Sequence, residues 1–101
     1  MIKVKIVLNE EKIKSEGTFD LAKMKFEIDK LFFDRNFHKE DDVFYVGTDH
    51  EDDFANAGLV CVGLGRSDWF LDNVLEWKWH RDGNEEDLLK DTGRYKAGFR
   101  S

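Results

Sequence analysis

The chain has 101 residues and a net charge of −6, and 41% of its residues are apolar, 14% aromatic and 38% charged. This length suits one ordinary domain, and the many large apolar side chains exclude an intrinsically disordered chain. The single cysteine, Cys61, excludes an intrachain disulfide and a CxxC motif. We find no apolar core of a signal peptide and no run of roughly 18 apolar residues that would span a membrane, so we expect a cytoplasmic protein.

The N-terminal part predicts one strand followed by one long helix. Residues 2–8 alternate apolar and polar side chains, which is typical of a strand with one buried face. Residues 9–17 are polar and predict a loop or the return arm of a hairpin. Residues 18–37 carry apolar residues at helical spacing, with Thr18 as the N-cap, and predict a helix. Residues 23–29 also alternate as in a strand, but the length and composition of the segment favour the helix.

The second part predicts three strands and two short helical segments. Residues 43–46 and 59–62 are apolar runs bounded by polar residues or glycine, and 59–62 is typical of a buried strand. Residues 74–80 alternate clearly and predict a further strand. Residues 67–73 predict a helical turn, and residues 84–90 predict a short helix with acids in its first turn.

These elements predict an α+β fold for the whole chain, 1–101, as a single domain. Their order is strand, helix, strand, strand, strand, helix, so that four strands covered by helices on one face make a two-layer structure. Residues 92–101 contain three Lys/Arg and no acid, and we predict a flexible basic tail.

Acidic residues are concentrated in the second part of the sequence. Residues 40–91 hold 4 Lys/Arg and 15 Asp/Glu, a net charge of −11, whereas residues 1–39 hold 9 and 7, a net charge of +2. Such an asymmetry favours a basic protein partner and disfavours DNA binding through the acidic part, because phosphates require clustered cations. The predicted partner-binding residues are Glu40, Asp41, Asp42, Asp49, Glu51, Asp52, Asp53 and Trp69.

Residues 49–53 place carboxylates at alternating positions, as calcium loops do. An EF-hand would need glycine where Phe54 stands and glutamate where Val60 stands, so that motif is excluded. A small metal binder or hydrolytic enzyme that uses these acids together with His50 is an alternative hypothesis.

Two further sequence patterns do not match the nucleotide-binding or zinc sites that they partly resemble. Residues 63–67 contain two glycines, but Asp68 stands in place of the third glycine of a dinucleotide fingerprint. The three histidines and Cys61 lack the short spacings of zinc sites, and Cys61 is predicted to be a small core residue. We therefore predict no catalytic residue, no metal and no cofactor.

Phe19, Phe26 and Phe33 recur every seven residues along the predicted helix, opposite its main apolar stripe. A helix with two opposed apolar faces cannot bury both against one sheet. The second face needs cover from the C-terminal segment, a second copy of the chain or a partner, and these phenylalanines are the predicted residues of self-association.

Together these features favour a non-enzymatic accessory or regulatory protein of bacterial or phage type. Its acidic part would bind a basic protein such as a nucleic-acid-handling enzyme. The first alternative is a structural protein that forms a homodimer through the aromatic helix face, and the second is the small enzyme or metal binder.

Overall fold

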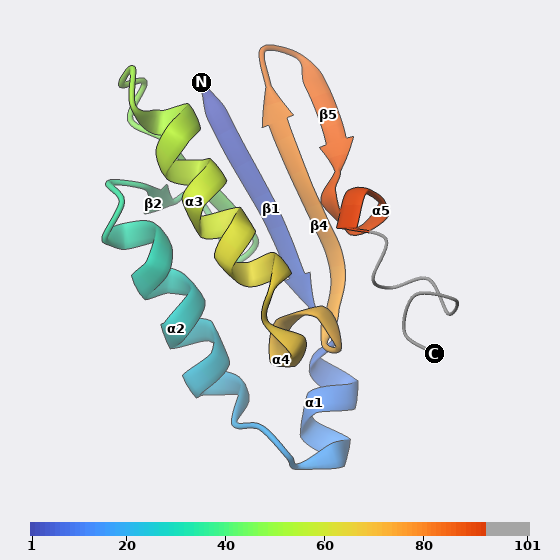
Figure 1. Cartoon of the computed structure of the whole chain (residues 1–101). Helices are drawn as coiled ribbons and strands as arrows, with labels where there is room; N and C mark the ends of the chain where they lie inside the picture. Colours follow the sequence, from blue (N-terminus) through green and yellow to red (C-terminus); the bar gives the residue numbers. More distant parts are fainter. Residues whose placement is uncertain (93–101) are drawn as a thin grey trace.

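The computed structural model describes residues 1–92, which form a mixed α+β domain of one antiparallel sheet and five helices (Figure 1). The predicted fold class is confirmed, although the sheet has five strands rather than four. In chain order the elements are β1 (Ile2–Leu8), α1 (Glu10–Glu16), α2 (Leu21–Phe33), β2 (His38–Lys39), β3 (Phe44–Val46), α3 (Asp53–Gly65), α4 (Asp68–Leu71), β4 (Val74–Arg81), β5 (Asn84–Asp87) and α5 (Leu88–Thr92).

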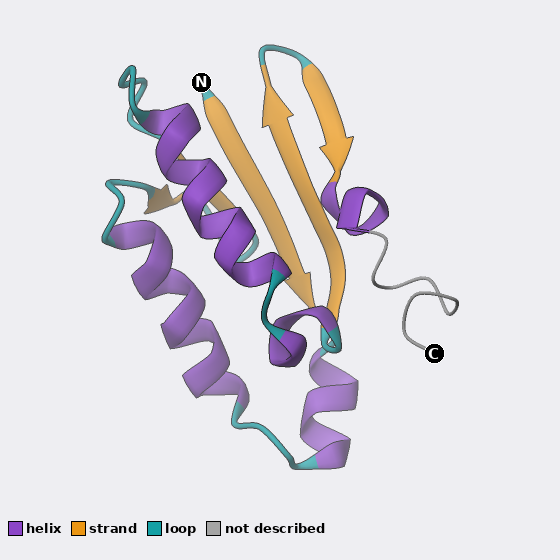
Figure 2. Ribbon diagram, viewed as in Figure 1, coloured by secondary structure: helices purple, strands orange, loops and turns teal. Residues whose placement is uncertain are grey.

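The sheet has the strand order β2-β3-β1-β4-β5, and every neighbouring pair is antiparallel. The N-terminal strand β1 therefore lies at the centre, between β3 and β4. Helices α2 and α3 run along one face of the sheet, with α3 in front of β1 (Figures 1 and 2). The predicted two layers are thus present.

The core lies between these helices and the sheet. Alternate residues of β1 are buried, as their spacing predicts. Trp77 of β4 is buried and packs edge-on against Phe70, with ring centroids 5.1 Å apart. Phe32 of α2 stacks on Tyr45 of β3 at 4.2 Å, and the Tyr45 hydroxyl donates a hydrogen bond to Asp29. These contacts fix α2 and the α3–α4 segment on the sheet.

The segment predicted as a loop or hairpin arm, 9–17, is instead helix α1. The Asn9 side chain accepts the Lys12 backbone N–H at 3.2 Å, and the helix ends at Gly17, whose φ is 67°. Helix α2 begins later than predicted, because Asp20 and not Thr18 caps it by accepting the Ala22 N–H at 2.9 Å. Residues 23–29 are helical, so the strand alternative is wrong.

Two predictions in the second part are wrong. Residues 59–62 are not a strand but the middle of helix α3, and the glycine-rich segment 63–67 includes the end of that helix. Residues 84–87 of the predicted helix 84–90 form β5 instead, because Asp82 and Gly83 make a two-residue hairpin turn with φ of 49° and 83°, whereas residues 88–90 are helical as predicted and belong to α5. The predicted strands 2–8, 43–46 and 74–80 and the helical turn at 67–73 are present with small changes of boundary.

Apart from Thr92, the predicted basic tail 92–101 lies outside the described residues.

Two glycine substitutions should test the corrected elements by changing stability in opposite directions. Gly83→Ala forces a side chain into a left-handed turn and should lower the free energy of unfolding by about 1 kcal/mol. Gly58→Ala, in α3 with open space around the added Cβ, should raise it by up to about 1 kcal/mol. Urea denaturation followed by circular dichroism measures both changes, and a loss of stability in Gly58→Ala would contradict the helical assignment.

Candidate interaction surfaces

The acids of residues 49–53 form a compact loop that leads into α3. The buried Asp53 carboxylate accepts the backbone N–H of His50 at 3.1 Å, and His50 Nδ1 accepts the N–H of Asp52 at 3.1 Å. Only 4% of Asp53 is exposed, so this predicted partner-binding residue is instead part of the loop's own structure. Asp49, Glu51 and Asp52 are exposed at the N-terminal end of α3.

The acids of residues 40–42 lie elsewhere, in the turn between β2 and β3. The Asp41 carboxylate accepts the N–H groups of Val43 at 2.8 Å and Phe44 at 3.1 Å, and Glu40 pairs with Lys3 at 3.1 Å. This turn and the 49–53 loop are at opposite ends of β3, so the structure does not bring the two acidic segments together.

Trp69 is separate from both acidic segments. It belongs to α4, is partly buried, and contacts Phe70 with ring centroids 6.1 Å apart. It also lines a shallow groove with Phe19 and Met24 at the start of α2. The predicted partner-binding residues therefore occupy three places on the molecule rather than one face.

Helix α3 exposes an apolar surface that the sequence analysis did not find. No residue from 54 to 65 is charged, yet Phe54, Leu59 and Val62 are 52%, 56% and 53% exposed. Ala55 and Gly63 are also exposed on this helix. The opposite side of α3 buries Ala57, Val60, Cys61 and Leu64 against the core. We call the set Phe54, Ala55, Gly58, Leu59, Val62 and Gly63 the α3 outer face.

The three phenylalanines predicted on a second face of α2 are all exposed. Phe26 is 63% exposed, and Phe19 and Phe33 are about half exposed. The main stripe of Met24, Ile28 and Phe32 is buried. Helix α5 packs on β4 and not on α2, so no described residue of the C-terminal segment covers these rings.

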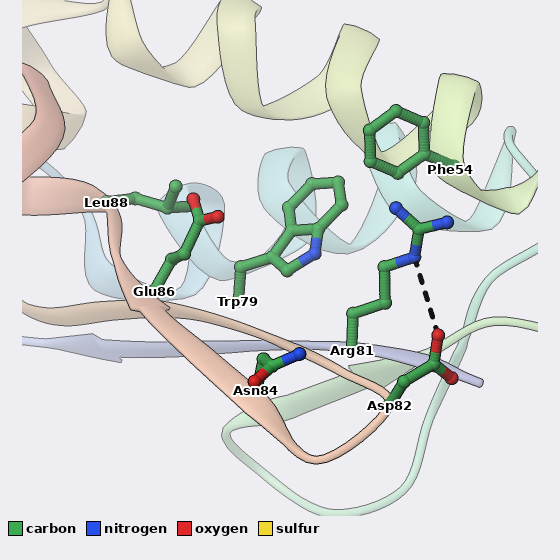
Figure 3. Close-up of a pocket in the computed structure, with 7 residues that line it drawn as sticks. All are labelled: Phe54, Trp79, Arg81, Asp82, Asn84, Glu86 and Leu88. Atoms are coloured by element: carbon green, nitrogen blue, oxygen red, sulfur yellow. Dashed lines mark ion pairs between the residues drawn. The ribbon is translucent and has the colours of Figure 1, made fainter.

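A groove opens between α3 and the β4–β5 hairpin. Its volume is about 470 Å³, and it is lined by Phe54, Trp79, Arg81, Asp82, Asn84, Glu86 and Leu88 (Figure 3). The Phe54 and Trp79 rings meet edge to face with centroids 5.6 Å apart, and the Arg81 guanidinium lies 4.4 Å from the centre of the Phe54 ring. Trp79 is only partly buried and lines this groove.

The face of the sheet opposite the helices carries lysines that are neutralised locally. Lys5 pairs with Glu76 at 3.2 Å, and Lys78 approaches the same carboxylate at 3.6 Å. The hydrogen bond from Lys5, followed by the charges of Lys5 and Lys78, lowers the pKa of Glu76. Lys3, Lys5 and Lys78 on this face therefore each lie within 4 Å of a carboxylate.

Cys61 lies in α3 rather than in the predicted strand, but it is buried in the core as expected. Burial raises the pKa of its thiol to about 12, and the neighbouring Trp77 indole acts more weakly in the opposite direction. Within residues 1–92, no three His, Cys, Asp or Glu side chains are grouped so that they could hold a metal ion. No described helix is long and apolar enough to cross a membrane.

Comparison with models of known protein families and with curated proteins finds no match to this chain.

The Cys61 thiol should be inert in the folded protein. At pH 8 its high pKa leaves thiolate on the order of 10³-fold scarcer than in the unfolded chain, and burial also blocks access. Ellman's reagent should therefore release almost no thionitrobenzoate from native protein and about one equivalent in 8 M urea. Rapid labelling under native conditions would contradict the burial of this side of α3.

Proposed function

We propose that this protein is a non-enzymatic interaction protein that binds a basic protein partner through the α3 outer face and the exposed acids of the loop before it. The observation that carries the proposal is the absence of charge along the solvent side of α3. Helices at a protein surface ordinarily present charged or polar residues to water, and a helix that is apolar all round is ordinarily buried. A partner that covers this face accounts for the pattern.

The energetic gain from covering the α3 outer face is substantial. Burial of apolar surface contributes roughly 25 cal/mol per Å², and full burial of a leucine or phenylalanine side chain contributes about 1.5–3 kcal/mol. Phe54, Leu59 and Val62 are each about half exposed, so all three can add to binding. These residues can form the apolar centre that stable interfaces require.

Two glycines of α3 are a further argument that a partner covers the α3 outer face. Gly58 and Gly63 each cost about 1 kcal/mol of helix stability relative to alanine, and an added Cβ at either position would meet no atom within 4 Å. No close contact within the described chain therefore accounts for them. Close approach of a partner's backbone to α3 would account for them, because small residues let two helices pack tightly.

Charge indicates the chemistry of the partner. Asp49, Glu51 and Asp52 are exposed at the N-terminal end of the α3 outer face, within a part of the chain whose net charge is −11. A partner that covers α3 and carries Lys or Arg beside this loop would gain association rate and specificity from the attraction. The proposal places the interaction in the cytoplasm, where a single free cysteine stays reduced.

The test compares two leucines of nearly equal exposure on different surfaces. Leu59 lies on the α3 outer face and is 56% exposed, whereas Leu75 of β4 is 55% exposed. Leu59→Asp should weaken capture of the partner from an extract of the producing cells at least tenfold, because it places a charge at the centre of the contact. Leu75→Asp should leave capture unchanged. Equal effects of the two substitutions would contradict the proposed surface.

Charge reversal tests the acidic loop separately. Asp49→Lys, Glu51→Lys and Asp52→Lys together should weaken capture, and raising the salt concentration from 0.05 to 0.5 M should weaken capture by the wild type. Asp53 is left unchanged because it is buried. Binding that neither the substitutions nor salt alters would exclude a basic partner.

Self-association through Phe19, Phe26 and Phe33 is the second candidate, because all three rings are exposed on or beside α2. Light scattering behind size exclusion measures the molar mass directly. If this face forms a homodimer, the wild type elutes at twice the mass of 11.9 kDa and Phe26→Asp elutes at 11.9 kDa. A wild-type monomer at low and at high salt would exclude it.

A further inference from the structure

The groove between α3 and the β4–β5 hairpin combines two aromatic rings with carboxylates. Trp79 and Glu86 are directly opposite each other on β4 and β5, so their side chains project to the same face of the sheet. In Figure 3 the Trp79 indole lies between Glu86 on one side and Phe54 with Arg81 on the other. The groove thus offers a ring face and a carboxylate that are close together.

The groove already holds one guanidinium. Arg81 lies 4.4 Å from the centre of the Phe54 ring, within the range of a cation–π contact, and its Nε is 3.8 Å from the Asp82 carboxylate. An aromatic ring on one side and a carboxylate on the other is a common way to hold arginine. Arg81 shows that the walls of this groove suit that side chain.

Glu86 and Trp79 form a second pair of the same kind, but without a cation. Glu85 pairs with Lys78 and His80 on the opposite face of the sheet, at 3.6 and 3.5 Å. Among the residues that the structure describes, no cation forms an ion pair with Glu86. The Asp82 carboxylate lies near two cations, Arg81 Nε at 3.8 Å and the N-terminal amino group at 3.7 Å, whereas the Glu86 carboxylate beside Trp79 has no ion-pair partner within residues 1–92.

We propose that this groove binds the guanidinium of an arginine from the protein partner, stacked on Trp79 and paired with Glu86. The inference rests on the proposed function, since it takes the partner to be a basic protein, and it adds a specific recognition element. Phe54 belongs both to the α3 outer face and to the groove, so a partner that covers α3 can place an arginine here.

Arginine fits this groove better than lysine. Its planar guanidinium can lie flat on an indole and donate two parallel hydrogen bonds to a carboxylate, whereas an ammonium is a compact, strongly hydrated point charge. An anion would be repelled by the Glu86 and Asp82 carboxylates.

The test follows the three tryptophan indole N–H signals in two-dimensional ¹H–¹⁵N NMR spectra of the full chain. The probe is N-acetyl-arginine N-methylamide, and its matched control is the citrulline analogue, which has the same shape without the charge. The arginine probe should shift the Trp79 signal saturably, with Kd in the millimolar range, and should leave the signal of the buried Trp77 in place. The citrulline analogue should not shift it.

Neighbouring glutamates supply the control variants. Glu86→Gln should weaken binding of the arginine probe about threefold or more, whereas Glu85→Gln, on the other face of the sheet, should not change it. Equal effects of the two variants, or equal shifts with arginine and citrulline, would overturn the proposal.

Two further variants separate this inference from its alternatives. Leu59→Asp should leave the arginine titration unchanged while it weakens partner capture at least tenfold, so the failure of one proposal does not imply the failure of the other. Arg94→Gln with Arg100→Gln should leave the Trp79 signal of the free protein unchanged. If that double variant moves the signal and raises affinity for the probe, the chain's own C-terminal arginines occupy the groove, and the proposal of a partner arginine is overturned.

Discussion

Packing of α3 on the centre of the sheet is the contact on which the rest of the molecule depends. Its buried side, Ala57, Val60, Cys61 and Leu64, joins the core that also contains Trp77 of β4. The sheet offers α3 only one side to pack against, and α2 lies on its flank. On the outer side of α3, Phe54 reaches Trp79 of the sheet, whereas Leu59 and Val62 are more than half exposed. Within residues 1–92, the two-layer architecture itself leaves that surface open.

The two proposed contacts meet at Phe54. On α3 this ring begins the α3 outer face, and toward β4 it forms a wall of the aromatic groove. The exposed acids of the preceding loop lie at the same end of the helix. Apolar area would supply most of the binding free energy, the loop acids would favour a basic partner, and the groove would add selectivity for arginine. The exposed phenylalanines of α2 remain a separate surface.

Clear periodicity made β1, α2 and β4 predictable from the sequence, and the 59–62 segment shows why α3 was not. A run that is apolar on every side has no helical period, so it is indistinguishable from a buried strand. The exposed apolar residues of α3 remove the helical period from the sequence, and the same residues form the surface that is proposed to bind a partner. The Asp82–Gly83 turn and the Asn9 cap were local signals that could have identified β5 and α1. The groove and the separation of the acidic segments depend on the tertiary fold, which no local pattern reveals.

Site-specific photo-crosslinking in living cells tests the central claim most directly. Val62 on the α3 outer face is replaced by p-benzoylphenylalanine, with Leu75 replaced in the same way as the control of similar exposure. The account predicts one discrete adduct with another protein from position 62 and none from position 75. Absence of an adduct at position 62, or an adduct whose mass equals two copies of the chain, would contradict it.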